Sequence, residues 1–174
     1  MRPSILTAAL ALSAAALPAA LSIAATPAPH VAATSFDQLA QPLPLPYDEG
    51  ANADQTIAVA KARALKAHKR LLIDLGGNWC LDCRILAGTI RLPGIDAFVA
   101  KHYEVVTVDV GRFDKNGQIA EHYGIKGRLA GVPAVLIVDP KTDRLVDAGH
   151  ETALSDARHM SPQGLADWLA QWAA

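Results

Sequence analysis

The two cysteines of this 174-residue chain lie three positions apart, at Cys80 and Cys83, and the chain contains no others. An apolar run, Leu71-Leu72-Ile73-Asp74-Leu75, and the pair Gly76-Gly77 come before them. This order predicts a buried strand, a tight turn and a helix that begins at the first cysteine. The free N–H groups and the macrodipole of a helix N-terminus stabilise a thiolate, which is the reactive form of cysteine. The sequence therefore predicts a redox site whose two sulfurs are close enough to form a Cys80–Cys83 disulfide.

Two other uses of a Cys-x-x-Cys pair compete with this interpretation. A structural zinc ion needs four ligands, but the chain has no second cysteine pair, and its six histidines include no His-x3–5-His pair. A purely structural disulfide would close so short a loop that it would hardly constrain the unfolded chain. We therefore expect no metal and no cofactor, and we keep the structural disulfide as the weaker alternative.

The first residues resemble an export signal. Arg2 is followed by residues 5–25, which carry no charge, are rich in alanine and leucine, and end in small residues. This pattern predicts a cleavable signal peptide over residues 1–25, with an uncleaved membrane anchor as the alternative. Export would place the cysteines where disulfides persist, in the periplasm if the source is a Gram-negative bacterium.

Composition and charge limit the remaining possibilities. A net charge of −1 and a pI near 6.6 give no reason to expect nucleic acid or an anionic membrane as a partner. Residues 26–50 are rich in proline, which predicts an extended tether, whereas residues 51–174 are long enough for one folded domain. Apolar residues between the later prolines leave open a fixed path of the second part of this segment over the domain surface.

Hydrophobic periodicity predicts elements in the order α-β-α-α-β-α-β-β-α. The expected helices span 52–69, 80–89, 95–102, 118–123 and the segment after Ser161-Pro162, and the expected strands span 71–75, 105–110, 134–138 and 145–148. Alternating strands and helices of this kind predict an α/β fold, with a central mixed sheet covered by helices on both faces.

Three separated features of the chain resemble the thioredoxin superfamily between about Asn52 and Trp172. Trp79 directly precedes Cys80, and Asp74 lies six residues ahead of Cys80, at the spacing of the family's buried acid. Val132-Pro133 comes just before an expected strand, like the family's cis-proline loop. The chain is also similar to exported thioredoxin-like proteins and to the C-terminal domain of the bacterial membrane disulfide reductase. The resemblance implies a thioredoxin fold and thiol–disulfide oxidoreductase activity.

The resemblance also implies roles for the cysteines and the acid. An exposed Cys80 would attack the partner's disulfide, and a more buried Cys83 would resolve the mixed disulfide that forms. Asp74 would accept the proton of Cys83, because burial in an apolar strand raises the pKa of a carboxyl group. The alternative is that the strand ends early and leaves Asp74 in solvent.

The same resemblance implies a surface for the substrate. Pro133 would remove an N–H near the sulfurs, and the backbone of Val132 would pair with an extended substrate segment. Trp79 would either shield the disulfide and contact the partner or fill part of the core.

Leu81 and Asp82 replace the residues that thioredoxins and strong oxidases carry between their cysteines. The charge of Asp82 disfavours a thiolate on Cys80, with Arg84 opposing it slightly, which indicates a reductant rather than an oxidant. We expect a monomer that acts on protein thiols and disulfides and takes electrons from a membrane-borne donor. The alternative function is a thioredoxin-fold binding module, such as a copper or haem-protein assembly chaperone.

Overall fold

The computed structural model describes residues 26–173. The predicted signal peptide, residues 1–25, lies outside the described residues. Within the described part, no helix combines the length and apolar character needed to cross a membrane.

A four-stranded sheet with the strand order β2-β1-β3-β4 forms the centre of the molecule. β1 (Arg70–Gly76) is parallel to β2 (Tyr103–Asp109) and antiparallel to β3 (Ala134–Asp139), so the sheet is mixed as expected. All of β1 except Arg70 is buried, because helices cover both faces of this inner strand.

The fourth strand is shorter than the sequence predicts. β4 covers only Arg144–Leu145, whereas a strand is expected over 145–148. The backbone N–H of Val146 still donates to the carbonyl of Ile137, but the N–H of Ile137 donates to the side chain of Asp147 at 2.9 Å. The ladder ends there because a carboxylate takes the place of a backbone acceptor.

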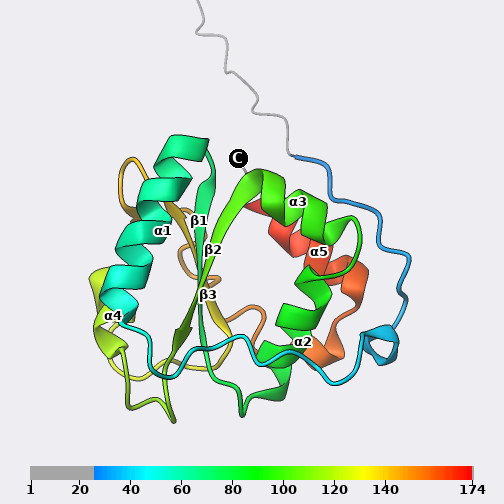
Figure 1. Cartoon of the computed structure of the whole chain (residues 1–174), viewed down its shortest axis with the longest axis horizontal. Coiled ribbons are helices and arrows are strands. Elements are labelled where there is room, and N and C mark those ends of the chain that lie inside the picture. The colour runs from blue at the N-terminus through cyan, green and yellow to red at the C-terminus, as the bar shows by residue number, and fades with distance from the viewer. Residues whose placement is uncertain (1–25, 174) are drawn as a thin grey trace, which may run out of the picture.

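Helices cover both faces of the sheet, which confirms the predicted α/β thioredoxin fold. One face carries α1 (Ala53–Ala67) and α4 (Gly117–His122), and the other carries α2 (Leu81–Ile90), α3 (Ile95–His102) and α5 (Pro162–Gln171) (Figure 1). Two short 3-10 helices are also present, η1 (Phe36–Gln38) and η2 (Ala157–His159). Each face of the sheet has its own apolar cluster.

Residues 26–50, which we call the N-terminal strap, do not form the predicted extended tether. The strap runs along the side of the molecule that carries α2 and α3 and then crosses below the sheet towards α1 (Figure 1). Val31 and Leu39 are buried in one apolar cluster and Tyr47 in the other. The prediction is wrong because the apolar residues spaced along the strap bury against the domain. The second part of the strap instead follows a fixed path over the domain surface, which is the alternative given in the sequence analysis.

Candidate redox-active site

Cys80 and Cys83 are joined by a disulfide at the start of α2. Cys80 is the N-cap residue, and its Sγ accepts the backbone N–H of Cys83 at 3.1 Å. Of the two residues, Cys83 is fully buried and Cys80 is 5% exposed. Cys83 is the more buried of the two, as expected, but the expectation of an exposed Cys80 is wrong, because Cys80 is itself buried at the start of α2. A partner therefore has to approach closely before its sulfur can meet the sulfur of Cys80.

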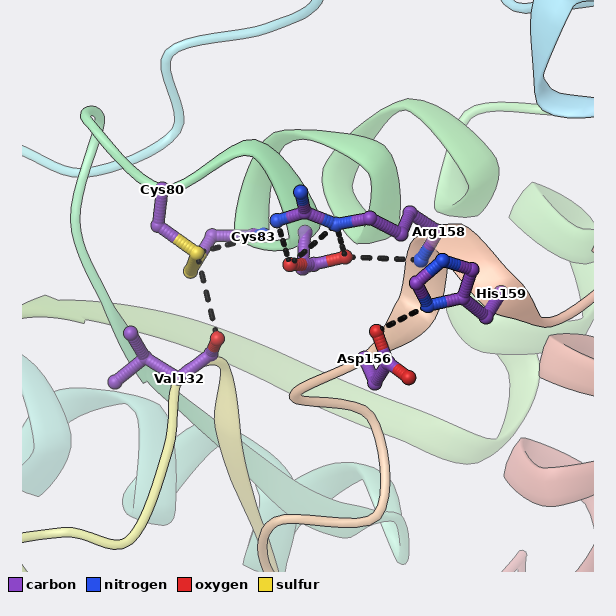
Figure 2. Close-up of polar contacts among 7 residues, drawn as sticks. Cys80, Cys83, Val132, Asp156, Arg158 and His159 are labelled. Carbon is purple, nitrogen blue, oxygen red and sulfur yellow. Dashed lines mark hydrogen bonds and ion pairs between the residues drawn. A yellow bond between two sulfur atoms is a disulfide. The ribbon is translucent and has the colours of Figure 1, made fainter.

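The loop before β3 lies against the disulfide. Figure 2 shows the carbonyl oxygen of Val132 facing the sulfur of Cys80, at 3.4 Å. The Val132–Pro133 peptide bond is cis, as the resemblance implies. The structure thus brings Val132 and Pro133 to the redox-active sulfurs, and their substrate-binding role stays a prediction.

Trp79 lies on the surface beside the site and does not fill the core. Its side chain is 42% exposed, and its indole N–H donates to the carbonyl of Gly111 at 2.7 Å. The ring centroids of Trp79 and Phe113 are 5.9 Å apart, and the Arg112 guanidinium lies 4.6 Å from the Trp79 ring centroid. The core alternative is therefore wrong. Contact of Trp79 with a partner stays a prediction.

Asp74 is a buried carboxyl group in the middle of β1, so the solvated alternative is also wrong. Burial raises its pKa to about 7, although a hydrogen bond from Tyr47 works in the opposite direction. The Tyr47 hydroxyl donates to Oδ1 of Asp74 at 2.8 Å. A group with this pKa can exchange a proton with a thiol near neutral pH.

The charge on Asp82 is balanced by a residue that sequence reasoning did not find. The Arg158 guanidinium donates to both carboxylate oxygens of Asp82, and the Arg158 backbone N–H donates to Oδ1 at 2.9 Å. Burial opposes ionisation of Asp82, but these hydrogen bonds and the charge of Arg158 outweigh it and lower the pKa of the carboxyl group. Figure 2 shows the Arg158 side chain extending from the segment around η2 towards the start of α2. Asp82 therefore disfavours a Cys80 thiolate less than an unpaired carboxylate would, because it is half of an ion pair.

Arg158→Gln is therefore expected to make the protein a stronger reductant. Without the guanidinium, the Asp82 carboxylate loses the cation that it is hydrogen-bonded to and disfavours the thiolate of Cys80 more strongly. A less stable reduced form lowers the reduction potential, by on the order of 30 mV. Titration against glutathione measures the change, with Arg63→Gln, which removes a surface ion pair with Glu104, as the control. A potential that rises or does not move would contradict this expectation.

These features define a thioredoxin-fold thiol–disulfide oxidoreductase, with a Cys-x-x-Cys disulfide at a helix N-terminus and a buried acid in the adjacent strand. The family model described as thioredoxin-like matches residues 52–140, and the chain belongs to this family. The expected superfamily and enzyme class are thereby confirmed.

Similar proteins agree with this assignment. Thioredoxin 1 of a Nostoc species is 29% identical over 107 residues, which are 60% of this chain and 92% of that protein. Thioredoxin-2 of Pyricularia oryzae is 35% identical over 102 residues, covering 56% of this chain and 54% of that protein. The crystal structure of a disulphide isomerase from Xylella fastidiosa Temecula1 is 40% identical with a TM-score of 0.67, and the match covers 74% of this chain and 96% of that one.

Proposed function

We propose that this protein is exported and reduces disulfide bonds of partner proteins in the periplasm, taking its electrons from a membrane-borne donor. The observation that carries the proposal is the Cys80–Cys83 disulfide, with the buried acid Asp74 in the strand that precedes it. Export is supported by the signal-like sequence of residues 1–25.

The reaction follows from the positions of the two sulfurs. The thiolate of Cys80 attacks a partner disulfide, so that one S–S bond breaks, a mixed disulfide forms and one partner thiolate leaves. The sulfur of Cys83 then attacks the sulfur of Cys80, which closes the Cys80–Cys83 bond and releases the second partner thiolate. Asp74 takes up the proton that Cys83 loses. Two electrons pass to the partner, and the donor must return two electrons to the cysteines.

The charges around α2 support the reducing direction. Neither residue between the cysteines is cationic, and the nearby guanidinium of Arg158 is paired with Asp82. Arg84 donates its hydrogen bonds to strap carbonyls. The Cys80 thiolate therefore depends mainly on the backbone N–H groups of α2 for its stabilisation.

Disulfide isomerisation is the second candidate, because the Xylella structure that resembles this chain is named a disulphide isomerase. A copper-binding or haem-protein assembly module is the alternative that the sequence left open.

The reduction potential of the Cys80–Cys83 pair, measured against glutathione in the chain without residues 1–25, tests the direction. We expect about −230 mV or lower, as for thioredoxin and the reducing glutaredoxins, together with reduction of insulin. A potential of about −120 to −180 mV would instead support an oxidase or an isomerase. Tight copper(I) binding without insulin reduction would support the binding module.

A further inference from the structure

The last part of the N-terminal strap is fixed to the redox helix. Arg84, the residue after Cys83, donates from Nη2 to the carbonyl of Leu43 at 2.9 Å and from Nε to the carbonyl of Pro44 at 3.2 Å. A strap that only covered apolar surface would not need these directed contacts. They fix the path of the strap relative to the start of α2.

The next strap residues are held just as closely. Pro46 accepts a hydrogen bond at its carbonyl from the Thr107 hydroxyl of β2, at 2.8 Å. The side chain of Asn78, in the turn before Cys80, accepts the N–H of Tyr47 at 3.1 Å and donates to its carbonyl at 2.8 Å. Both backbone polar groups of Tyr47 are thus paired with one amide, which fixes where its side chain begins.

The Tyr47 side chain enters the site from behind the disulfide. It is 3% exposed, and its hydroxyl donates to Asp74. A methyl group on Gly76 would overlap the Tyr47 hydroxyl and would lie 2.8 Å from the sulfur of Cys83. The hydroxyl and the buried sulfur therefore both lie beside the Cα of Gly76, which carries no side chain to separate them.

We propose that Tyr47 is a positioning residue of the redox site, whose hydroxyl holds the Asp74 carboxylate in place to accept the proton of Cys83. The strap residues 43–47 therefore complete the site. This role concerns the step in which Cys83 reacts, so it applies whether the protein reduces, oxidises or isomerises disulfides.

The charges around Tyr47 and Asp74 agree with this role. Burial, and then the charge of Asp74, keep the pKa of Tyr47 far above its ordinary value, so the hydroxyl stays a neutral donor. Asp109 at the end of β2 also acts on Tyr47, and its carboxylate is paired with Lys115 at 3.3 Å. The hydrogen bond from Tyr47 favours the ionised form of Asp74 against the effect of burial. Its loss should raise the pKa of Asp74 above this value of about 7.

Tyr47→Phe tests the proposal, because it removes only the hydroxyl. We expect the pKa of Asp74, followed by carbon-13 NMR of its carboxyl group in the disulfide form, to rise by about one unit. About half of the Asp74 carboxyl groups are ionised near pH 7 in the natural protein. A rise of one unit would leave about a tenth of them ionised, and would therefore slow disulfide exchange about fivefold at that pH. The rates should converge near pH 9, where both proteins are ionised at Asp74.

Tyr103→Phe is the matched control, because Tyr103 is also buried and donates from its hydroxyl to a backbone carbonyl, that of Leu169, remote from the disulfide. It should leave the pKa of Asp74 and the pH profile unchanged, and Asp74→Asn should abolish the inflection near pH 7. The proposal would be overturned if the pKa of Asp74 were unchanged in Tyr47→Phe, or if this variant slowed disulfide exchange by the same factor at every pH. The carboxyl titration needs no turnover, so it tests Tyr47 even if the protein proves not to be a reductase.

Discussion

Replacing Cys80 with serine is expected to lower disulfide exchange at least about a thousandfold, because a serine hydroxyl is not ionised at neutral pH and cannot replace the attacking thiolate. Cys83→Ser should have a different effect. It leaves the sulfur of Cys80, which we propose attacks, at the start of α2 but removes the fully buried sulfur that we propose resolves the intermediate. A covalent mixed disulfide with the partner should therefore accumulate.

Insulin reduction measures the loss of turnover, and mass spectrometry of a protein substrate mixed with each variant detects the trapped species. The trapped species should form with Cys83→Ser and disappear on addition of excess dithiothreitol. Circular dichroism checks that both variants fold. If Cys80→Ser instead formed the mixed disulfide, the roles assigned to the two cysteines would be reversed.

Leu39→Ala is expected to have the largest effect on stability among the strap variants. Leu39 is 3% exposed, and its Cδ1 packs over Gly88 of α2. Truncating a leucine at such a buried position removes apolar contact and leaves a cavity, which should lower the free energy of unfolding by about 2–4 kcal/mol. Urea denaturation of the chain without residues 1–25 measures this change as a lower midpoint at a constant slope.

Leu45→Ala is the matched control for Leu39→Ala, because the same substitution falls in the same strap on a side chain that is 64% exposed. It should change the free energy of unfolding by less than about 0.5 kcal/mol. Equal, small effects of the two variants would show that the strap does not stabilise the domain and would restore the prediction of an extended tether.

The sequence predicted those parts of the fold that depend on neighbouring residues. Helix caps such as Asn52 and Ser161 accept backbone N–H groups where their types indicate, because capping involves only residues two or three positions apart. The β1 run and the cysteine pair likewise carry their signal within a few positions. The short β4 was missed because the buried side chain of Asp147 takes a hydrogen bond that strand propensity cannot anticipate.

The site, like the fold, was predicted only in part from the sequence. Cys80, Cys83, Val132 and Pro133 come together as the resemblance implies, and Asp74 is buried in the strand before the cysteines, because the family motif gives their spacing. Tyr47 and Arg158 were not predicted as site residues, because they reach it from 27 and 76 positions away in the chain. The proline content of the strap favoured a spacer over the fixed path that its apolar residues left open. The sequence around Arg158, outside the expected helices and strands, carries no sign of the carboxylate that the arginine pairs with.

The ion pair between Asp82 and Arg158 cannot form until well after both cysteines have been synthesised. A chain made from its N-terminus has both cysteines long before Arg158 exists, since 76 positions separate that residue from Asp82. Until then the redox helix carries an unbalanced carboxylate, and its thiolate has less support than in the finished protein. The strap, in contrast, precedes the cysteines and is available from the outset. The thiolate of Cys80 therefore gains this support only after the chain has been made as far as Arg158 and that segment has folded back onto α2.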